Sequence, residues 1–459
     1  MKTKIFFFLT NIALCVHAQQ NDCPPYLILL QGGTNYTQSC GVDTRTKCVI
    51  QNINTIESMP FDGMSLNMVA SWGLMKPGQS FSYNAIYNEL GPLKGIFKKF
   101  TKNFVTVNIN NPGDLFDDVV WNTVISNFKN LAQAAKDAGL VGIFFDNEEY
   151  DLKWMNFPED YPGTTKTVKQ YQDQSELRGK QIMQAIVSIF PKAIILVYHG
   201  PYLSEPKTPS YVTMQQVAGA SYYELLGPFF VGLVEGKGTQ ATVIDGGEVY
   251  QYRTASDFKK SYDWRKDGIA SSNTNCAFIS QSLRSIWHNS VNISFGVYNR
   301  AWKTGYPMNP GIMKTTLINA LTQSDSYVWY YTESDDWAIP GKMPQQWIDS
   351  VSYAKSVAAN NRCLTSIVAT DEQKFKVDIY PNPSNQSSVI SYQLINNSEV
   401  KISVYDLLGK EIMKLAEENQ NAGGHQLNFN AENLKNGVYF IKVIISGREI
   451  TEKFIVNKN

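Results

Sequence analysis

Eight short apolar runs, separated by segments with helical spacing, fill residues 24–365 of the chain. The runs are Tyr26–Leu30, Gly63–Leu66, Phe104–Asn108, Val141–Asp146, Ala193–Tyr198, Ala241–Asp245, Ile293–Tyr298 and Tyr327–Thr332. Amphipathic spacing between them predicts helices over Trp121–Lys136, Leu177–Phe190 and Ile312–Leu321. Eight strand and helix units in roughly 340 residues predict an α/β fold, a (β/α)8 TIM barrel. The alternative is an open doubly wound sheet, which the absence of a Gly-rich first turn disfavours.

The pattern changes after Cys363. Residues 366–376 are polar and unpatterned, as in a linker. From residue 377 to residue 459, apolar and polar residues alternate in short runs that are separated by turns rich in Asn and Gly. This pattern predicts that the barrel is followed by a small all-β sandwich of antiparallel strands.

Four motifs of this C-terminal segment occur in a fixed order: Tyr380–Pro383, Tyr405–Ile412, Leu434–Val443 and Lys453–Lys458. Together they resemble the C-terminal sorting domain of type IX secretion in Bacteroidetes. The resemblance implies that the type IX secretion machinery carries the protein across the outer membrane, so that it is secreted or attached to the outer cell surface. The alternative is an ordinary carbohydrate-binding sandwich.

The first 18 residues have the form of a secretory signal peptide. Lys2 and Lys4 precede a short apolar run that ends at Val16, and the small residue Ala18 stands at the expected cleavage position. The run is too short to span a bilayer, and no other long apolar run follows, so we expect no transmembrane helix.

Export leads to an oxidising compartment, in which disulfides form. Five cysteines remain after cleavage: Cys23, Cys40, Cys48, Cys276 and Cys363. Cys40 and Cys48 are near enough in the sequence to close one loop, although the sequence leaves the pairing open. Because the number is odd, one thiol stays unpaired or pairs with another molecule.

Composition limits the chemistry of the barrel. The 41 basic residues balance the 41 acidic ones, so no overall charge attracts nucleic acid or an anionic membrane, and a neutral partner is expected. The four histidines are scattered, and no Gly-rich phosphate-binding loop is present, so we expect neither a metal nor another cofactor. Chemistry would therefore depend on carboxylates and aromatic rings.

The end of the fourth predicted strand carries the strongest local signal. Strand alternation places Phe144, Asp146 and Glu148 on one face, so that two carboxylates project together where the strand ends. A shared, poorly solvated site raises the pKa of one carboxyl group, which suits a general acid. The alternative is that these residues cap the next helix or pair with an arginine.

Two resemblances to glycoside hydrolases meet at this strand. Asn147 and Glu148 resemble the acid/base pair of the large retaining barrel clan, although residues 295–300 lack the nucleophilic Glu that this clan has after its seventh strand. The segment Gly142–Glu148 also resembles the fourth-strand motif of chitinases and endo-β-N-acetylglucosaminidases, with Phe144 in place of the first Asp. The second resemblance implies that Asp146 orients the acetamido group of the substrate and that Glu148 protonates the leaving oxygen.

A second carboxylate must come from another strand. Asp245 and Glu248 flank two glycines after the sixth run, and Glu333 follows the eighth. We expect Glu248 to be the catalytic partner of Glu148, because the flexible turn brings two acids into one short loop.

Aromatic and polar residues at strand ends supply surfaces on which a sugar can stack and form hydrogen bonds. The predicted substrate-binding residues are Tyr150, Tyr198, His199, Asp245, Asn299, Trp302, Trp329, Tyr331 and Glu333. Together with the catalytic set Asp146, Glu148 and Glu248, they predict a secreted glycoside hydrolase that acts on a poly- or oligosaccharide. Two alternatives remain: a non-catalytic glycan-binding barrel at the cell surface, and a metal-dependent hydrolase with Asp146, Glu148 and Asp245 as oxygen ligands.

Overall fold

The computed structural model describes residues 25–32, 40–148, 153–212, 223–248, 250–301, 305–333, 337–374 and 377–458, the last range with gaps at 395–396, 408, 422 and 446–447. The predicted signal peptide, residues 1–18, lies outside the described residues. The chain divides into two compact units, Met1–Arg362 and Cys363–Asn459.

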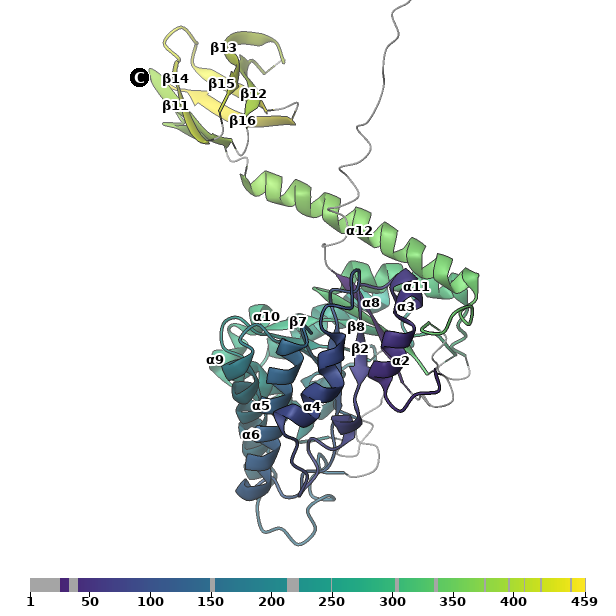
Figure 1. Ribbon diagram of the computed structural model, residues 1–459. Helices are drawn as coiled ribbons and strands as arrows, with labels where there is room; N and C mark the ends of the chain where they lie inside the picture. The colour runs from purple at the N-terminus through teal and green to yellow at the C-terminus, as the bar shows by residue number, and fades with distance from the viewer. Residues whose placement is uncertain are drawn as a thin grey trace, which may run out of the picture. The chain divides into compact units, whose positions relative to one another are not determined.

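The first unit contains a sheet in which every pair of neighbouring strands is parallel (Figure 1). Its segments are β1 (Tyr26–Gln31), β2 (Gly63–Asn67), β3 (Phe104–Asn108), β4 (Gly142–Asp146), β5 (Ile194–Val197), β6 (Thr242–Asp245), β7 (Val291–Ile293), β8 (Phe295–Tyr298) and β9 (Tyr327–Thr332). Each of the eight predicted runs holds a strand, and the predicted α/β barrel is confirmed.

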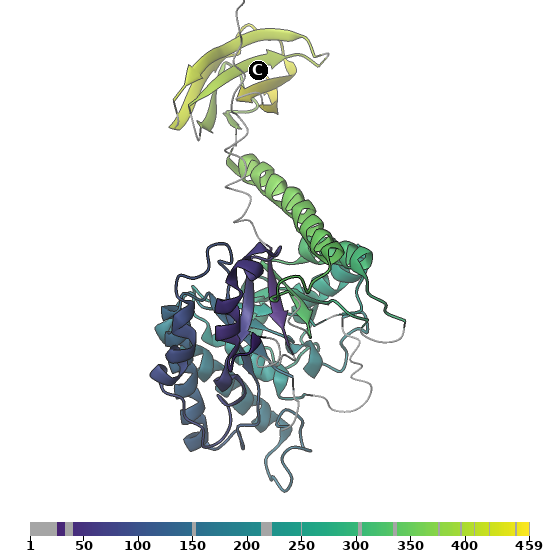
Figure 2. The same ribbon diagram turned by 45° about the vertical axis from the view of Figure 1, so that its right-hand side comes forward.

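The sheet closes through the seventh run, which is broken at Ser294. Its first part, β7, pairs with β6, and its second part, β8, pairs with β9. The N–H of Gly296 also donates to the carbonyl of Gly247 (2.9 Å), and β9 pairs with β1 (Figure 2). The nine segments therefore form the eight positions of one barrel.

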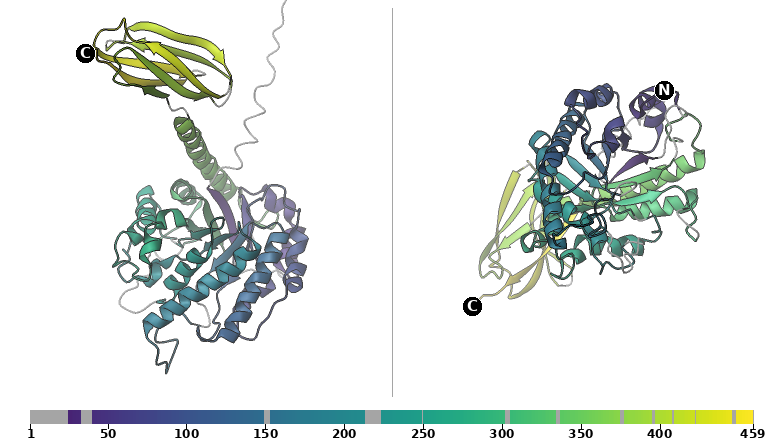
Figure 3. Two further views of the ribbon diagram at one scale, coloured as in Figure 1. Left: turned by 90° about the vertical axis from the view of Figure 1, so that its left-hand side faces the viewer. Right: turned by 90° about the horizontal axis from the view of Figure 1, so that it is seen from below.

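Helices cover the outside of the barrel and pack beside their neighbours in the sequence (Figures 1 and 3). They are α2 (Arg45–Gln51), α3 (Ile53–Ser58), α4 (Tyr83–Leu90), α5 (Asp118–Asp137), α6 (Val168–Ile189), α7 (Leu226–Gly236), α8 (Ala255–Lys266), α9 (Gln281–Arg284), α10 (Trp287–Ser290) and α11 (Pro310–Gln323). The three predicted helices correspond to α5, α6 and α11, although Phe190 lies one residue beyond the end of α6. Polar caps begin the long helices: the carboxylate of Asp117 accepts from two N–H groups of α5, and Thr167 and Gln170 form a capping box at α6.

Because side chains alternate along each strand, the apolar ones form two separate layers. One lies inside the barrel and includes Phe104, Phe144, Leu196, Ile244 and Trp329, while the other lies between the strands and the helices. A Cβ atom at Gly296 would lie 2.3 Å from the Trp329 ring, so the indole occupies the space that a side chain would need. The inner layer is thus a packed floor beneath the ends of the strands.

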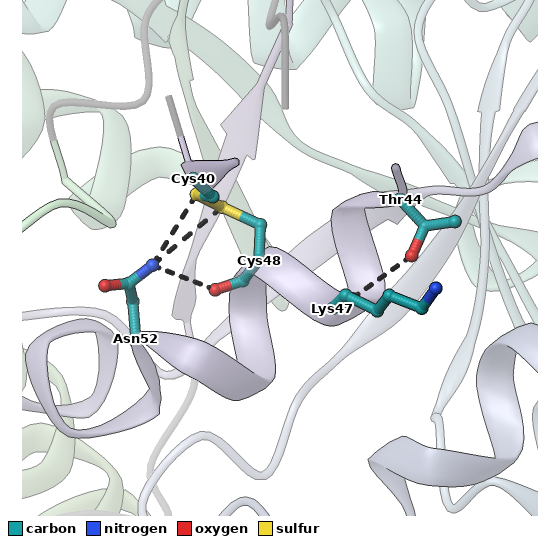
Figure 4. The surroundings of a disulfide bond; sticks show 5 residues. All are labelled: Cys40, Thr44, Lys47, Cys48 and Asn52. Carbon is teal, nitrogen blue, oxygen red and sulfur yellow. Dashed lines mark hydrogen bonds between the residues drawn. A yellow bond between two sulfur atoms is a disulfide. The ribbon is translucent and has the colours of Figure 1, made fainter. Parts of the chain in front are cut away.

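A disulfide joins Cys40 to Cys48 at the start of α2 (Figure 4). The helix begins with Thr44, whose hydroxyl accepts from the N–H of Lys47 (3.3 Å), and Asn52 donates to the carbonyl of Cys48 (3.0 Å). Cys276 is buried as a free thiol.

The second unit holds two antiparallel sheets around its own apolar core. The strands are β10 (Val377–Tyr380), β11 (Ser387–Leu394), β12 (Ser398–Tyr405), β13 (Glu411–Gln420), β14 (Gly423–Asn430), β15 (Gly437–Ile445) and β16 (Arg448–Val456). Helix α12 (Gln345–Lys374) continues through most of the stretch predicted as a linker, where Ala, Glu, Gln and Lys favour helix. Among the described residues, no helix combines the length and hydropathy that crossing a bilayer requires.

Candidate functional site

Glu148 stands directly beyond β4, on the inward face of the barrel. Phe144 of the same strand belongs to the inner apolar layer, and Asp146 and Glu148 follow it at intervals of two residues. Asn108 donates to one oxygen of the buried Asp146 (2.7 Å), and the N–H of Glu148 donates to the other (3.1 Å). Asp146 therefore fixes the backbone from which the Glu148 side chain projects.

Glu248 returns to the barrel wall after the turn that ends β6. Gly247 has a φ of 58°, a conformation that favours glycine. The turn lets Glu248 form a parallel bridge with Gly296 of β8. Its side chain keeps only 14% of its surface exposed, so the second carboxylate is partly withdrawn from water.

Glu148, His199 and Glu248 converge at the carboxyl ends of β4, β5 and β6. One side-chain ligand atom from each lies within 4.8 Å of those of the other two. The Nε2 atom of His199 is 3.0 Å from an oxygen of Glu248 and 3.7 Å from an oxygen of Glu148. Neither contact has the geometry of a hydrogen bond. His199 Nε2 and Glu248 Oε2 therefore remain able to form hydrogen bonds with a ligand.

His199 is held rigidly in this cluster. Its backbone N–H donates to Asn147, whose side-chain amide donates back to the carbonyl of His199 (both 2.9 Å). On the ring, Nδ1 lies 3.0 Å from the hydroxyl of Tyr202. The His199 side chain is only 2% exposed, so its ring is almost fully enclosed by the protein.

The cluster shifts the acidity of its members. Burial and the neighbouring Glu148 charge raise the pKa of Glu248, against the opposing effect of His199. Burial alone would lower the pKa of His199, but Tyr202 and the two carboxylates outweigh it, and the pKa is raised. Burial and the facing Glu248 raise the pKa of Tyr250, so Tyr250 remains a phenol at neutral pH.

Five aromatic rings line the barrel below and beside the carboxylates. Tyr198 stacks on Trp329, with 4.9 Å between ring centroids, and Tyr250 and Tyr298 pack against Tyr331. Trp329 is fully buried, and its indole N–H donates to the carbonyl of Gly246 (2.9 Å). Trp329 therefore supports the floor of the site, and the tyrosines lie nearer its opening.

Asp245 is not brought to the cluster. Its neighbour Ile244 points inward, so Asp245 points outward, where both of its oxygens accept from Arg265 of α8 (2.8 and 2.5 Å). Arg265 also donates to the carbonyl of Ser294 at the β7–β8 break (3.1 Å). The oxygen-ligand set Asp146, Glu148 and Asp245 is thus divided between the two faces of the barrel wall.

Of the remaining predicted residues, Glu333 lies beside the site tyrosines Tyr298 and Tyr331, Asn299 points away from the site, and two lie outside the described part. Asn299 donates to Thr332 (3.1 Å), on the side of the strands opposite to Tyr298 and Tyr331. Glu333 pairs with Arg300 at an exposed position, 3.3 Å apart. Tyr150 and Trp302 lie outside the described residues.

Several residues of the site escaped the sequence prediction. Tyr202 and Tyr250 contact or face the cluster, whereas Asn147, which the sequence paired with Glu148, holds the backbone of His199. Asn67 and Asn108 hold buried side-chain oxygens that have no partner among the described residues, at the ends of β2 and β3. Both asparagines stand directly at the ends of predicted strands, which marks them as polar strand-end residues in the sequence, although they were not among the predicted substrate-binding residues.

The buried ion pair of Asp245 leads to a prediction about stability. Asp245→Asn leaves the Arg265 charge without its partner, and we expect it to lower the free energy of unfolding by about 3 kcal/mol or more. The control is Asp267→Asn. The Asp267 carboxylate pairs with His288 at an exposed position, so its loss should change the free energy of unfolding by less than about 1 kcal/mol. Calorimetry of the barrel transition measures both, and equal transition temperatures would contradict the prediction.

Comparison with known proteins identifies the second unit. Residues 378–457 match the family model described as the secretion system C-terminal sorting domain. No curated protein matches the chain.

Among solved structures, the chain is similar to a GH18 chitinase from Pseudoalteromonas aurantia, at 15% identity over 72% of this chain and 99% of that chain, with a TM-score of 0.37. It is also similar to a β-mannanase from the blue mussel Mytilus edulis, at 12% identity over 72% and 92% of the two chains, with a TM-score of 0.41. These similarities are too low to bear on activity. The C-terminal unit is a type IX sorting domain, which directs the protein to the cell surface or the extracellular space.

Proposed function

We propose that the barrel is a glycoside hydrolase in which Glu148 is the general acid/base and Glu248 is the second catalytic carboxylate. The observation that carries this proposal is the approach of the two carboxylates to within 4.8 Å at the carboxyl ends of parallel strands, where barrel enzymes hold their active sites. Retaining glycosidases separate their two carboxyl groups by about 5 Å, and inverting ones by about 6.5 to 9.5 Å. The short separation favours retention.

The surroundings of the carboxylates support a neutral sugar as substrate. Asn67 and Asn108 offer buried acceptor oxygens to sugar hydroxyl groups or to an acetamido N–H. Tyr250 and Tyr331 stack on each other, with 6.0 Å between ring centroids, beside the same opening. Asp146 already accepts hydrogen bonds on both oxygens, so a direct double displacement is favoured over a substrate-assisted reaction that depends on Asp146.

The configuration of the first product tests this mechanism. We expect proton NMR, recorded in the first minutes of turnover, to show the anomer of the substrate before mutarotation begins. Initial formation of the opposite anomer would contradict the assignment of Glu248 as nucleophile.

A metal-dependent hydrolase is the second candidate, because two carboxylate oxygens and one imidazole nitrogen within 4.8 Å of one another also suit a divalent cation. The two candidates differ in their response to a chelator. Under our proposal, dialysis against EDTA changes turnover by less than about twofold. Loss of activity that zinc or manganese restores would favour the metal enzyme.

A further inference from the structure

The inner wall that β2 and β3 form in the barrel is polar toward its carboxyl end. Phe104 of β3 belongs to the inner apolar layer, so alternation turns Thr106 and Asn108 inward as well. The hydroxyl groups of Thr106 and of Ser65 on β2 are 2.6 Å apart and satisfy each other. Asn108 stands one step nearer the end of its strand, level with Asp146 on β4. It thus lies beside the strand from whose end Glu148 projects.

The side-chain amide of Asn108 is held in one orientation. Its Nδ2 atom donates to Oδ2 of Asp146 at 2.7 Å, and the other oxygen of Asp146 accepts from the N–H of Glu148 at 3.1 Å. Asn108 is only 4% exposed, so the amide is enclosed by the protein on most sides. Because the amide nitrogen faces Asp146, the amide oxygen is the end that is left for another partner.

The oxygen of this amide needs a hydrogen-bond donor. Asn108 Oδ1 is buried and has no hydrogen-bond partner among the described residues. A buried acceptor without a donor is unfavourable, so such an oxygen takes its hydrogen from water or from a ligand. A ligand that displaces the water satisfies the oxygen only if it offers a donor in the same place. Sugar hydroxyl groups and an acetamido N–H meet this condition, whereas a methylene group, an ether or ester oxygen and a carboxylate do not.

We propose that Asn108 is a specificity-determining residue, whose buried oxygen selects a sugar unit that carries a free hydrogen-bond donor at one ring position. This inference rests on the proposed glycosidase function. A site that accepts a hydrogen bond from its substrate strongly rejects an analogue without that donor, because the buried acceptor is then left unpaired. Sugars that are deoxygenated, O-methylated or O-acetylated at the selected position are therefore poor substrates.

Substrate analogues test this selection on the wild-type protein. The parent substrates are the 4-nitrophenyl glycosides of glucose, mannose, galactose and N-acetylglucosamine. The analogues are the monodeoxy and mono-O-methyl derivatives of the parent that the mature protein, residues 19–459, cleaves fastest. We expect both derivatives of one ring position to lower kcat/KM about 100-fold or more. The chemistry of that position, a hydroxyl or the acetamido group, identifies the donor. A loss below about tenfold at every position would overturn the proposal.

A pair of asparagine variants assigns the selection to Asn108. Asn108→Leu keeps the volume of the side chain and removes the acceptor, so the parent and its deoxy analogue should differ by less than about threefold in kcat/KM. The matched control is Asn299→Leu. Asn299 also donates through Nδ2 and holds a buried Oδ1 that has no partner among the described residues, but it points away from the site. It should keep the discrimination of the wild type. Asn108→Ala gives the same readout should circular dichroism show that Asn108→Leu is unfolded.

The ratio between parent and analogue separates selection from mere support of Asp146. If Asn108 only held Asp146 in place, its variants would lower turnover of both sugars alike, and this unchanged ratio would overturn the proposal. Calorimetric binding of the corresponding methyl glycosides measures the same preference without turnover. A wild-type protein that binds these sugars but cleaves no glycoside would count against the proposed function, while its preference in binding would still decide the role of Asn108. A protein that neither binds nor cleaves any parent sugar would overturn both.

Discussion

Glu148→Gln is expected to lower kcat about 10²- to 10⁴-fold while the barrel remains folded. Glutamine keeps the shape of the side chain but cannot deliver a proton to the leaving oxygen, and proton transfer by a positioned group contributes factors of about 10² to 10⁴. Binding should persist, since the tyrosines and the acceptor oxygens of Asn67 and Asn108 are untouched. The measurement is steady-state turnover on a natural glycan, together with calorimetric binding of that glycan.

The matched control is Glu235→Gln. Glu235 lies on α7, in the outer helical layer, where it pairs with Lys180 of α6 at 3.2 Å. Its loss should change turnover by less than about twofold, because an outer ion pair contributes little. A Glu148→Gln protein that keeps a tenth or more of wild-type activity would show that Glu148 is not the proton donor.

Deletion of residues 375–459 is expected to abolish appearance of the protein outside the cell. The sorting domain has its own apolar core, which shares no residue with the core of the barrel. The truncated protein should therefore fold and accumulate in the periplasm. Cell fractionation with immunodetection measures this, and circular dichroism of the purified truncation checks its fold.

Glu148→Gln in the full chain serves as the export control, because it alters the barrel and leaves the sorting domain intact. It should reach the outside in wild-type amounts. Finding the truncated protein outside the cell at a comparable level would mean that residues 375–459 are not required for export.

The sequence predicted the barrel because its strands are short apolar runs that only a parallel sheet covered by helices buries. Alternation along β4 also sufficed to place Glu148 inward with Phe144. The glycine pair of the following turn led to the prediction of Glu248, and Gly247 adopts the left-handed conformation in this turn. These features depend on local pattern, which a single sequence contains.

The rest of the site depends on distances between strands, which local pattern does not give. His199 was expected to contact substrate, but only the folded chain places it between Glu148 and Glu248. Tyr202 lies beyond the end of β5 and carries no signal for its contact with the ring. Asp245 was expected to bind substrate, but Ile244 beside it points inward, and Asp245 pairs on the outer side with Arg265, 20 residues away along the chain.

Glu148 and Glu248 are proposed to hydrolyse a glycosidic bond together. The most direct measurement is mass spectrometry of a panel of neutral poly- and oligosaccharides after incubation with mature wild-type protein and with its Glu148→Gln and Glu248→Gln variants. We expect the wild-type protein to shorten at least one glycan and both variants to bind this glycan without cleaving it. Cleavage by either variant at the wild-type rate, or a glycan that the wild-type protein binds tightly and leaves intact, would contradict this expectation.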